Sequence, residues 1–186
     1  MIKHNEDKLN QLIEAFLEGE KESFDQIASI IHQDIINIAY YYVGNIEDSK
    51  DILQNVLLKI YKKIKFFKKA AKFSSWIYRI TANTSLDLLR KRKRTYNLKN
   101  RYGKEHEDYQ LFKQDKEVKN KSMLIKETIS NLSDKQKKVF ILKHYQGLTI
   151  QEVSKVLGCS QSTVKTHLVR AVDNIRKILG GSYEMS

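Results

Sequence analysis

The sequence predicts an all-α protein made of two small helical domains that are joined by a flexible linker. Three observations lead to this fold class. Apolar residues recur at the spacing of amphipathic helices, and no segment alternates as a half-buried strand does. The chain has no proline and seven glycines in 186 residues, which favours long helices with short connections. Residues 95–122 have few aliphatic side chains and no sustained period, as expected of a linker.

Four amphipathic helices are expected in residues 1–94, the first domain. Ser23, followed by Gln26, predicts a capping box at the start of the second helix, and the Gly44-Asn45 pair should end it. Ser74 or Ser75 should cap the fourth helix. The positions expected to face the core are Leu9, Leu12, Ile13, Phe16, Leu17, Phe24, Ile27, Ile30, Ile31, Leu53, Val56, Leu57, Ile60, Ile64, Trp76, Ile77, Ile80 and Leu88.

Residues 123–186, the second domain, predict a helix-turn-helix unit. Ser133 with Gln136 and Thr149 with Glu152 form two further capping-box patterns. The short helix after Thr149 is followed by a turn at Gly158 and by a longer amphipathic helix. Two helices joined by a short turn that contains glycine are typical of DNA-binding proteins.

Charge is unevenly distributed along the chain. The formal net charge is +12, but residues 1–60 carry −6, residues 61–104 carry +14, residues 105–122 carry −1 and residues 123–186 carry +5. A single polyanionic partner would repel the first segment while it attracted the second. The sequence therefore predicts two partners, of which one is a polyanion such as nucleic acid.

The second helix of the helix-turn-helix unit carries the side chains expected to read duplex DNA. In such units the N-terminal residues of that helix reach base edges in the major groove. Arg170 or Lys165 could bind guanine, and Gln161 could bind adenine. The alternative is an ordinary helical hairpin with a solvated polar face. The candidates are Gln161, Ser162, Thr163, Lys165, Thr166, His167 and Arg170.

Aromatic and basic residues are interleaved between Tyr61 and Arg79. Cations that follow a backbone, together with rings that stack on bases, suit single-stranded nucleic acid. The alternative is that the rings belong to the core, which periodicity favours for Tyr61 and Trp76. The rings of Phe66, Phe67 and Phe73 are harder to explain as core, because they lie in or beside an expected loop.

Asp48, Asp51, Gln54 and Asn55 are expected to share one face of the third helix. The face could dock a basic protein helix or could be merely solvated, and spacing alone favours the solvated alternative. A cation site is less favoured, because no third carboxylate or phosphate-binding loop accompanies these residues.

Catalysis, metal binding and membrane insertion have little support. The chain has no phosphate-binding or nucleophile-elbow motif, its five histidines lack ligand or triad spacing, and the single Cys159 precludes an internal disulfide. No apolar stretch approaches the roughly 20 residues that span a bilayer, and the N-terminus lacks a secretory signal pattern. We expect a cytoplasmic protein that is not an enzyme and needs no cofactor or metal.

In combination these segments resemble the bacterial RNA polymerase sigma factors, specifically the two-domain extracytoplasmic-function (ECF, group four) family. The stretch DILQNVLLKIYKKI from Asp51 resembles the helix that binds the polymerase clamp. FSSWIYRITANTSLDLLRKRKR from Phe73 resembles the helix that melts the promoter and reads its minus-ten element. NLSDKQKKVFILKHYQGLTIQEVSKVLGCSQSTVKTHLVRAVDNIRKIL from Asn131 resembles the domain that reads the minus-thirty-five element.

The resemblance implies a function and a set of partners: core RNA polymerase, promoter DNA and, commonly in this family, an anti-sigma factor. It assigns Asp48, Asp51, Gln54 and Asn55 to the clamp of the largest subunit, and Phe140 to the flap of the second-largest subunit. It assigns the duplex-reading candidates above to the minus-thirty-five element. For the minus-ten element it implies Lys65, Phe66, Phe67, Lys68, Lys72, Phe73, Trp76, Arg79 and Asn83.

Two positions depart from the family pattern. Asn55 stands where the family usually has Glu, which weakens the charge of the clamp-binding face, and Ser133 stands where it usually has Pro. Ser133 begins a helix as well as proline does. The main alternative function is a stand-alone helix-turn-helix regulator, which leaves Phe66, Phe67 and the acidic first 60 residues unexplained. A metal-dependent nuclease that uses Asp48 and Asp51 is a more distant alternative.

Overall fold

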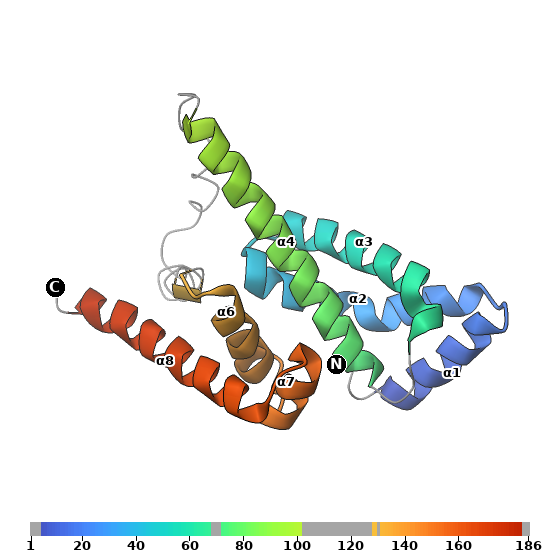
Figure 1. Ribbon diagram of the computed structural model, residues 1–186. Helices are drawn as coiled ribbons and strands as arrows, with labels where there is room; N and C mark the ends of the chain where they lie inside the picture. Colours follow the sequence, from blue (N-terminus) through green and yellow to red (C-terminus); the bar gives the residue numbers. More distant parts are fainter. Residues whose placement is uncertain (1–4, 68–71, 102–127, 130, 184–186) are drawn as a thin grey trace.

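The computed structural model describes residues 5–67, 72–101, 128–129 and 131–183. Within these residues the protein is helical and contains no strand, which confirms the predicted all-α class (Figure 1). The elements in chain order are α1 (Glu6–Leu17), α2 (Glu22–Val43), α3 (Ile46–Lys63), the 3₁₀ turn η2 (Ile64–Phe66), α4 (Phe73–Arg101), α6 (Asp134–Phe140), the π-helical turn η3 (Ile141–Tyr145), α7 (Ile150–Leu157) and α8 (Gln161–Tyr183).

In the N-terminal half, helices α1, α3 and α4 pack around α2. Isoleucines recur along α2 at the spacing of one helix face, and Ile27, Ile31, Ile35 and Ile38 are fully buried. Gly44 then ends α2 in the left-handed conformation, with a φ of 78°, which glycine adopts readily because it has no Cβ. Asn45 caps α3, since its side chain accepts a hydrogen bond from the N–H of Asp48.

Two of the three predicted capping boxes are confirmed. Ser133 caps α6 and Thr149 caps α7, and in both the reciprocal bond from the third residue of the helix is present. The capping box predicted at Ser23 was wrong. Helix α2 begins two residues earlier, at Glu22 after the N-cap position Lys21, so Ser23 lies inside the first turn and is buried rather than capping it.

Helix α4 does not begin at a serine cap either. It begins at Phe73, and the backbone N–H groups of Phe73 and Ser74 donate to the carboxylate of Glu6. Glu6 lies in the first turn of α1. A carboxylate from a distant helix therefore satisfies donors that a helix start leaves unpaired, and it also suits the positive end of the helix dipole.

Helix α4 is longer than the sequence suggested. It continues to Arg101, so the linker does not begin at residue 95, and the remainder of the expected linker lies outside the described residues. Lysine and arginine have good helix propensity, and no glycine or proline interrupts the basic run 91–94. The C-terminal part of α4 projects beyond the bundle (Figure 1).

The C-terminal half has the predicted helix-turn-helix unit. Helix α7 ends at Gly158, whose φ of 65° makes the sharp turn into α8. Ser160, in the turn, accepts a hydrogen bond of 3.1 Å from the N–H of Thr163 and so caps α8. Val153, Val156 and Val164 are fully buried between these helices and α6.

Candidate polymerase and nucleic-acid interfaces

The exposed face of α3 contains three of the four residues predicted to bind the polymerase clamp. Asp51, Gln54 and Asn55 are exposed along one side of the helix. Leu58, one turn further on, is 57% exposed and extends this side with an apolar surface. Polar and apolar groups thus lie next to each other on one rigid helix, an arrangement suited to a protein partner.

Asp48 is not part of that exposed face. It is only 7% exposed, and its carboxylate accepts hydrogen bonds from both terminal nitrogens of Arg92 and from the Asn45 side chain. This ion pair connects the first turn of α3 to the projecting part of α4. The expectation that Asp48 belongs to the same face as Asp51 is corrected, because the carboxylate points toward α4.

The aromatic residues of the basic segment separate into exposed and buried rings. Phe66 is 71% exposed, and the Lys65 ammonium lies 5.1 Å from its ring centroid. Phe67 and Trp76 are half-buried, with their ring centroids 5.4 Å apart. Lys72 is exposed, and Lys68 lies outside the described residues. Phe66 is therefore the ring that is most available to stack on a base.

Two expectations for these rings are corrected. Phe73 is fully buried, and its ring centroid lies 5.2 Å from that of Phe67, so it is a core residue rather than a candidate base contact. Tyr61, which periodicity assigned to the core, is 48% exposed and packs against the rings of Phe16 and Phe24 in T-shaped arrangements. The ring of Phe73 points inward because α4 begins at this residue.

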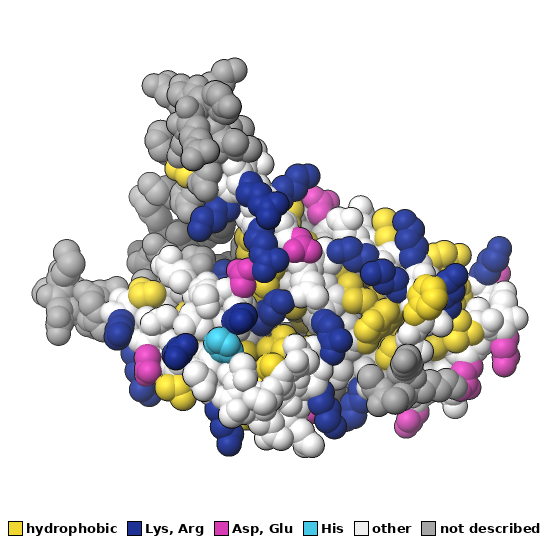
Figure 2. All heavy atoms as spheres, viewed as in Figure 1, with side chains coloured by type: hydrophobic (Ala, Val, Ile, Leu, Met, Phe, Trp, Pro, Cys, Tyr) yellow, Lys and Arg dark blue, Asp and Glu magenta, His cyan; other side chains and the backbone are white. Residues whose placement is uncertain are grey.

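Basic side chains gather along the exposed side of α4, as Figure 2 shows. Lys91, Arg92, Lys93 and Arg94 are all exposed in its projecting part. Hydrophobic side chains form a patch over the C-terminal part of α3 in the same view, where Leu58, Tyr61 and Phe66 are exposed. The basic run of α4 therefore lies near the start of α3, where Arg92 binds Asp48, whereas the exposed rings lie at the other end of α3.

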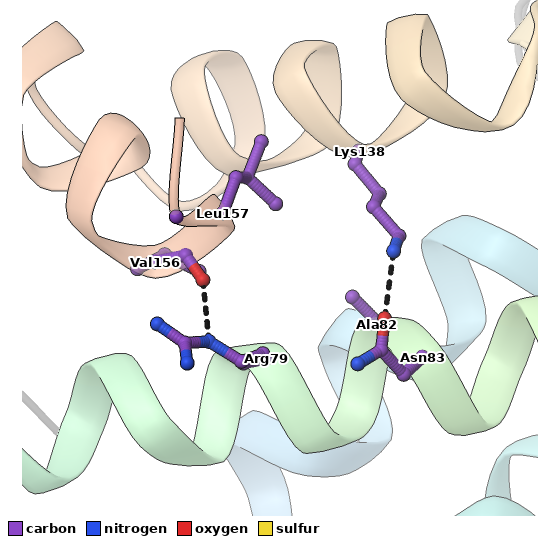
Figure 3. A pocket seen from close by; sticks show the side chains of 7 residues that line it. Arg79, Ala82, Asn83, Lys138, Val156 and Leu157 are labelled. Atoms are coloured by element: carbon purple, nitrogen blue, oxygen red, sulfur yellow. Dashed lines mark hydrogen bonds between the residues drawn. The ribbon is translucent and has the colours of Figure 1, made fainter. Parts of the chain in front are cut away.

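Arg79 and Asn83, the remaining minus-ten candidates, face the C-terminal half of the same chain (Figure 3). The Arg79 Nε donates to the carbonyl of Val156 at 2.6 Å, and Nη2 donates to the carbonyl of Lys155 at 2.8 Å. The ammonium of Lys138, on α6, donates to Asn83 Oδ1 at 2.6 Å. These residues border a small pocket of about 140 Å³ between α4, α6 and α7.

Ionic contacts continue this junction along α4. Arg90 binds Asp134 at 2.5 Å and Asp87 at 3.2 Å, and Lys72 lies 3.9 Å from Glu152. Burial lowers the pKa of Lys138, and the positive charge of nearby Arg90 lowers it further. Tyr41 of α2 stacks on Tyr145 of η3, with ring centroids 3.9 Å apart. Sequence patterns gave no signal for Asp134 or Lys138, because their partners are distant in the chain.

The duplex-reading candidates lie together at the N-terminal end of α8. Gln161, Ser162, Thr163, Lys165, Thr166 and Arg170 are exposed, and His167 is half-buried. The Thr166 hydroxyl donates to the carbonyl of Ser162 at 3.0 Å, which fixes its orientation. The first three turns of α8 therefore present donors and acceptors on a capped, rigid helix, as major-groove readout requires.

Phe140, the candidate for the polymerase flap, is half-buried at the end of α6. Its ring centroid lies 4.7 Å from the His144 ring and 6.1 Å from the Tyr145 ring. It thus belongs to an aromatic group that also contacts Tyr41 of the N-terminal half.

The described part of the chain contains no group of three or more histidine, cysteine or acidic residues that could hold a metal ion. None of its helices has the length and hydropathy needed to cross a membrane.

Comparison with protein families gives matches in both halves. Residues 29–95 match the family described as Sigma-70 region 2, and residues 122–175 match Sigma-70, region 4. The chain is 29% identical over 180 residues to the ECF RNA polymerase sigma factor SigW of Bacillus subtilis, which covers 92% of this chain and 96% of SigW. It is 25% identical over 181 residues to the RNA polymerase sigma-H factor of Pseudomonas aeruginosa, and the match covers 91% of this chain and 92% of that protein.

Solved structures show the same fold. CnrH, solved in complex with the cytosolic domain of CnrY, superposes with a TM-score of 0.68 at 18% identity and covers 91% of this chain and 96% of its own. The sigma factor RpoE from Bartonella quintana, solved with the anti-sigma factor NepR, superposes with a TM-score of 0.64 at 20% identity. The match covers 86% of this chain and 98% of the RpoE chain. The chain belongs to the ECF group of the sigma-70 family. It is a promoter-recognising RNA polymerase sigma factor, a regulator of transcription rather than a stand-alone helix-turn-helix protein.

Proposed function

We propose that this sigma factor docks on core RNA polymerase through the exposed face of α3. Asp51, Gln54 and Asn55 would contact the clamp of the largest subunit, with Leu58 adding apolar area. The exposure of these residues on one helix face supports the assignment. Asp48 would instead hold α3 against Arg92 of α4. Phe140 would contribute to a second contact, with the flap of the second-largest subunit.

The minus-ten element would be opened and held by the surface around η2 and α4. Lys65, Lys68 and Lys72 would follow the phosphate backbone, and Phe66 would stack on an unpaired base. Trp76, Arg79 and Asn83 would contact neighbouring bases or phosphates, while Phe67 and Phe73 support the surface from beneath. The observation that carries this proposal is the exposed ring of Phe66 beside the ammonium of Lys65. Each stacked base would contribute about 1–3 kcal/mol toward strand opening, so no ATP is required.

The first three turns of α8 would read the minus-thirty-five duplex. Exposed Lys165 and Arg170 suit guanine, and Gln161 suits adenine. Ser162, Thr163, Thr166 and His167 would contact bases or phosphates beside them. The two elements would be read by separate domains, which correspond to residues 1–94 with the projecting end of α4 and to residues 123–186.

The protein would work in the cytoplasm with polymerase and would be held inactive by an anti-sigma factor. A sigma factor of similar fold, RpoE from Bartonella quintana, was solved with the anti-sigma factor NepR, and CnrH, also of similar fold, was solved with the cytosolic domain of CnrY. The exposed apolar side chains Leu58, Tyr61 and Phe66 give such a partner a surface to cover.

Reconstituted transcription tests this function. The purified protein is added to core polymerase with a genomic DNA library, and transcript starts are mapped by sequencing. We expect starts at a shared promoter sequence that are absent with core polymerase alone. Absence of promoter-dependent stimulation would contradict the proposal, and tight sequence-specific duplex binding without polymerase would favour the stand-alone regulator instead.

A further inference from the structure

One carboxylate of α1 holds the start of the helix proposed to bind the minus-ten element. Glu6, in the first turn of α1, accepts hydrogen bonds from the backbone N–H groups of Phe73 and Ser74, which begin α4 (Figure 1). Glu6 is half-buried, whereas its neighbour Asp7 is exposed. The first turn of α4 thus depends on an acceptor that lies 67 residues away in the chain.

The local sequence offers no replacement for Glu6 at the N-cap position of α4. Lys72 occupies this position, because its carbonyl accepts the first intrahelical hydrogen bond, from the N–H of Trp76 at 3.2 Å. A lysine side chain has donors but no acceptor. Phe73 and Ser74 are both buried, so water is a poor substitute partner for their N–H groups. Without Glu6 these donors would be buried and unpaired, which costs their desolvation free energy.

Phe73 connects this cap to the other rings of the minus-ten surface. Its ring centroid lies 5.2 Å from that of Phe67 and 5.5 Å from that of Trp76, and the latter two centroids are 5.4 Å apart. We call these three residues the ring cluster. Phe67 also directly follows Phe66, the last residue of η2, and donates its N–H to the carbonyl of Ile64 at 2.9 Å. A shift of the first turn of α4 would therefore disturb the ring cluster and the neighbouring ring of Phe66.

The charge of Glu6 is opposed to a direct role in DNA binding. Residues 61–104 carry a net charge of +14, which attracts phosphates. A carboxylate bound at Phe73, within this segment, repels them, so its removal should favour DNA binding if only its charge mattered. Its hydrogen bonds to two backbone donors of α4 instead suit a residue that holds this helix in place.

We propose that Glu6 is a positioning residue for promoter opening. It fixes the first turn of α4 and thereby holds the ring cluster and Phe66 in the arrangement that stacks on an unpaired base. This inference rests on the proposed function of the surface around η2 and α4. When the cap is lost, the ring cluster is ordered in only a fraction of the molecules, and capture of the opened strand weakens in proportion to that fraction.

Trp76, the single tryptophan of the chain, reports on the ring cluster directly. Glu6→Gln removes the charge but nearly keeps the shape of the side chain, and Asp7→Asn is the matched control in the same turn of α1. Acrylamide quenching of tryptophan fluorescence is measured at a temperature below the unfolding transition of every variant. We expect a quenching constant about two-fold higher in Glu6→Gln than in wild type, and no change in Asp7→Asn. Equal quenching of the two variants would overturn the proposal.

The kinetics of promoter opening separate positioning from electrostatics and from a loss of folded protein. Holoenzyme is reconstituted with each variant, and permanganate reactivity of unpaired thymines is followed over time at a promoter obtained from the transcript mapping described above. The concentration dependence of the observed rate separates initial binding from opening.

We expect the maximal opening rate of Glu6→Gln to fall about five-fold, which corresponds to about 1 kcal/mol, the size of a lost helix cap. The half-saturating concentration should stay unchanged, and Asp7→Asn should match wild type. A role of charge alone would make opening by Glu6→Gln faster, and a loss of folded protein would lower only the amplitude. Either of these results would overturn the proposal.

A local cap tests whether Glu6 acts through the start of α4. Lys72→Ser places a hydroxyl acceptor at the N-cap position. Because it also removes a proposed phosphate contact, the effect of Glu6→Gln is compared within each background. We expect Glu6→Gln to slow opening about five-fold in the wild-type background and less than about two-fold in the Lys72→Ser background. Equal effects in the two backgrounds would overturn capping as the means by which Glu6 acts.

Wild-type holoenzyme distinguishes this inference from the proposed function. Failure of the wild-type holoenzyme to open promoters would count against the proposed function and against the inference that rests on it. Normal opening by wild type together with equal opening by Glu6→Gln would retain that function and overturn Glu6 as a positioning residue.

Discussion

Arg92 binds Asp48 through both terminal nitrogens, and this pair connects the start of α3 to the projecting part of α4. Asn45, the cap of α3, donates to the same carboxylate. The face proposed for polymerase and the helix proposed for promoter DNA are thus held together by one largely buried carboxylate. The contact separates Asp48, which binds Arg92, from Asp51, although the sequence pattern predicts both aspartates on one face of the helix.

Asp48→Asn should therefore reduce stability. The substitution keeps the shape of the side chain but removes the charge that Arg92 binds. We expect a loss of about 1–2 kcal/mol, at the lower end for hydrogen bonds to charged groups because Arg92 is half-exposed. Urea unfolding followed by circular dichroism measures the change.

Asp51→Asn is the matched control for that substitution. Asp51 is exposed, so its removal should change stability by less than about 0.5 kcal/mol. Its binding to core polymerase, measured by surface plasmon resonance, should weaken, whereas Asp48→Asn should retain binding below its unfolding transition. The opposite pattern would show that Asp48 contacts polymerase.

Phe66→Ala should impair promoter opening without destabilising the protein. The ring is 71% exposed, so little buried area is lost, but a stacked base would lose about 1–3 kcal/mol. Permanganate footprinting of unpaired thymines measures opening. Phe73→Ala is the contrast, because deletion of this fully buried ring should cost about 3–5 kcal/mol of folding free energy. Normal opening by Phe66→Ala at wild-type stability would remove the ring from the site.

Gly158→Ala should destabilise the helix-turn-helix unit through its backbone. A Cβ at this position meets no atom within 4 Å, so the cost arises from the φ of +65°. We expect a loss of about 1–2 kcal/mol, measured by thermal unfolding. Gly158→Asn should lose less, since asparagine tolerates the left-handed region. Equal losses in the two variants would point to packing instead.

Arg170→Ala should relax base preference in the upstream promoter element. Arg170 is exposed on the part of α8 proposed to read DNA, and one bidentate base contact is worth about 1–3 kcal/mol of discrimination. Transcription from promoters randomised at minus thirty-five measures the preference. Arg176→Ala removes the same charge further along α8 and should weaken all promoters about equally. A uniform loss in both variants would place Arg170 on the phosphate backbone.

Sequence patterns predicted the structure correctly where the interacting residues lie close together in the chain. Ser133 and Thr149 cap their helices as predicted because each bond joins residues three apart. Gly44 and Gly158 end helices through their own backbone conformation. The helix-turn-helix unit and the exposure of the residues proposed to read DNA were predictable for the same reason, since periodicity within one helix decides which side is buried.

Ser23 and Phe73 show where local reasoning fails. The same capping pattern at Ser23 is overridden, and the residue is buried within the first turn of α2. Phe73 looked like a loop residue, but Glu6 of α1 accepts hydrogen bonds from its N–H and from that of Ser74, and thereby sets the start of α4. The partner lies 67 residues away, beyond any local pattern.

The sequence by itself determined the all-α class, the helix-turn-helix unit, the basic and acidic segments and the family. Only the tertiary structure decided that Asp48 binds Arg92 and that Arg79 caps the end of α7. Helical period and capping depend on residues within one or two turns, which the sequence displays directly. The direction of a polar side chain depends on which distant acceptor the packed helices bring to it, and that acceptor is known only after folding.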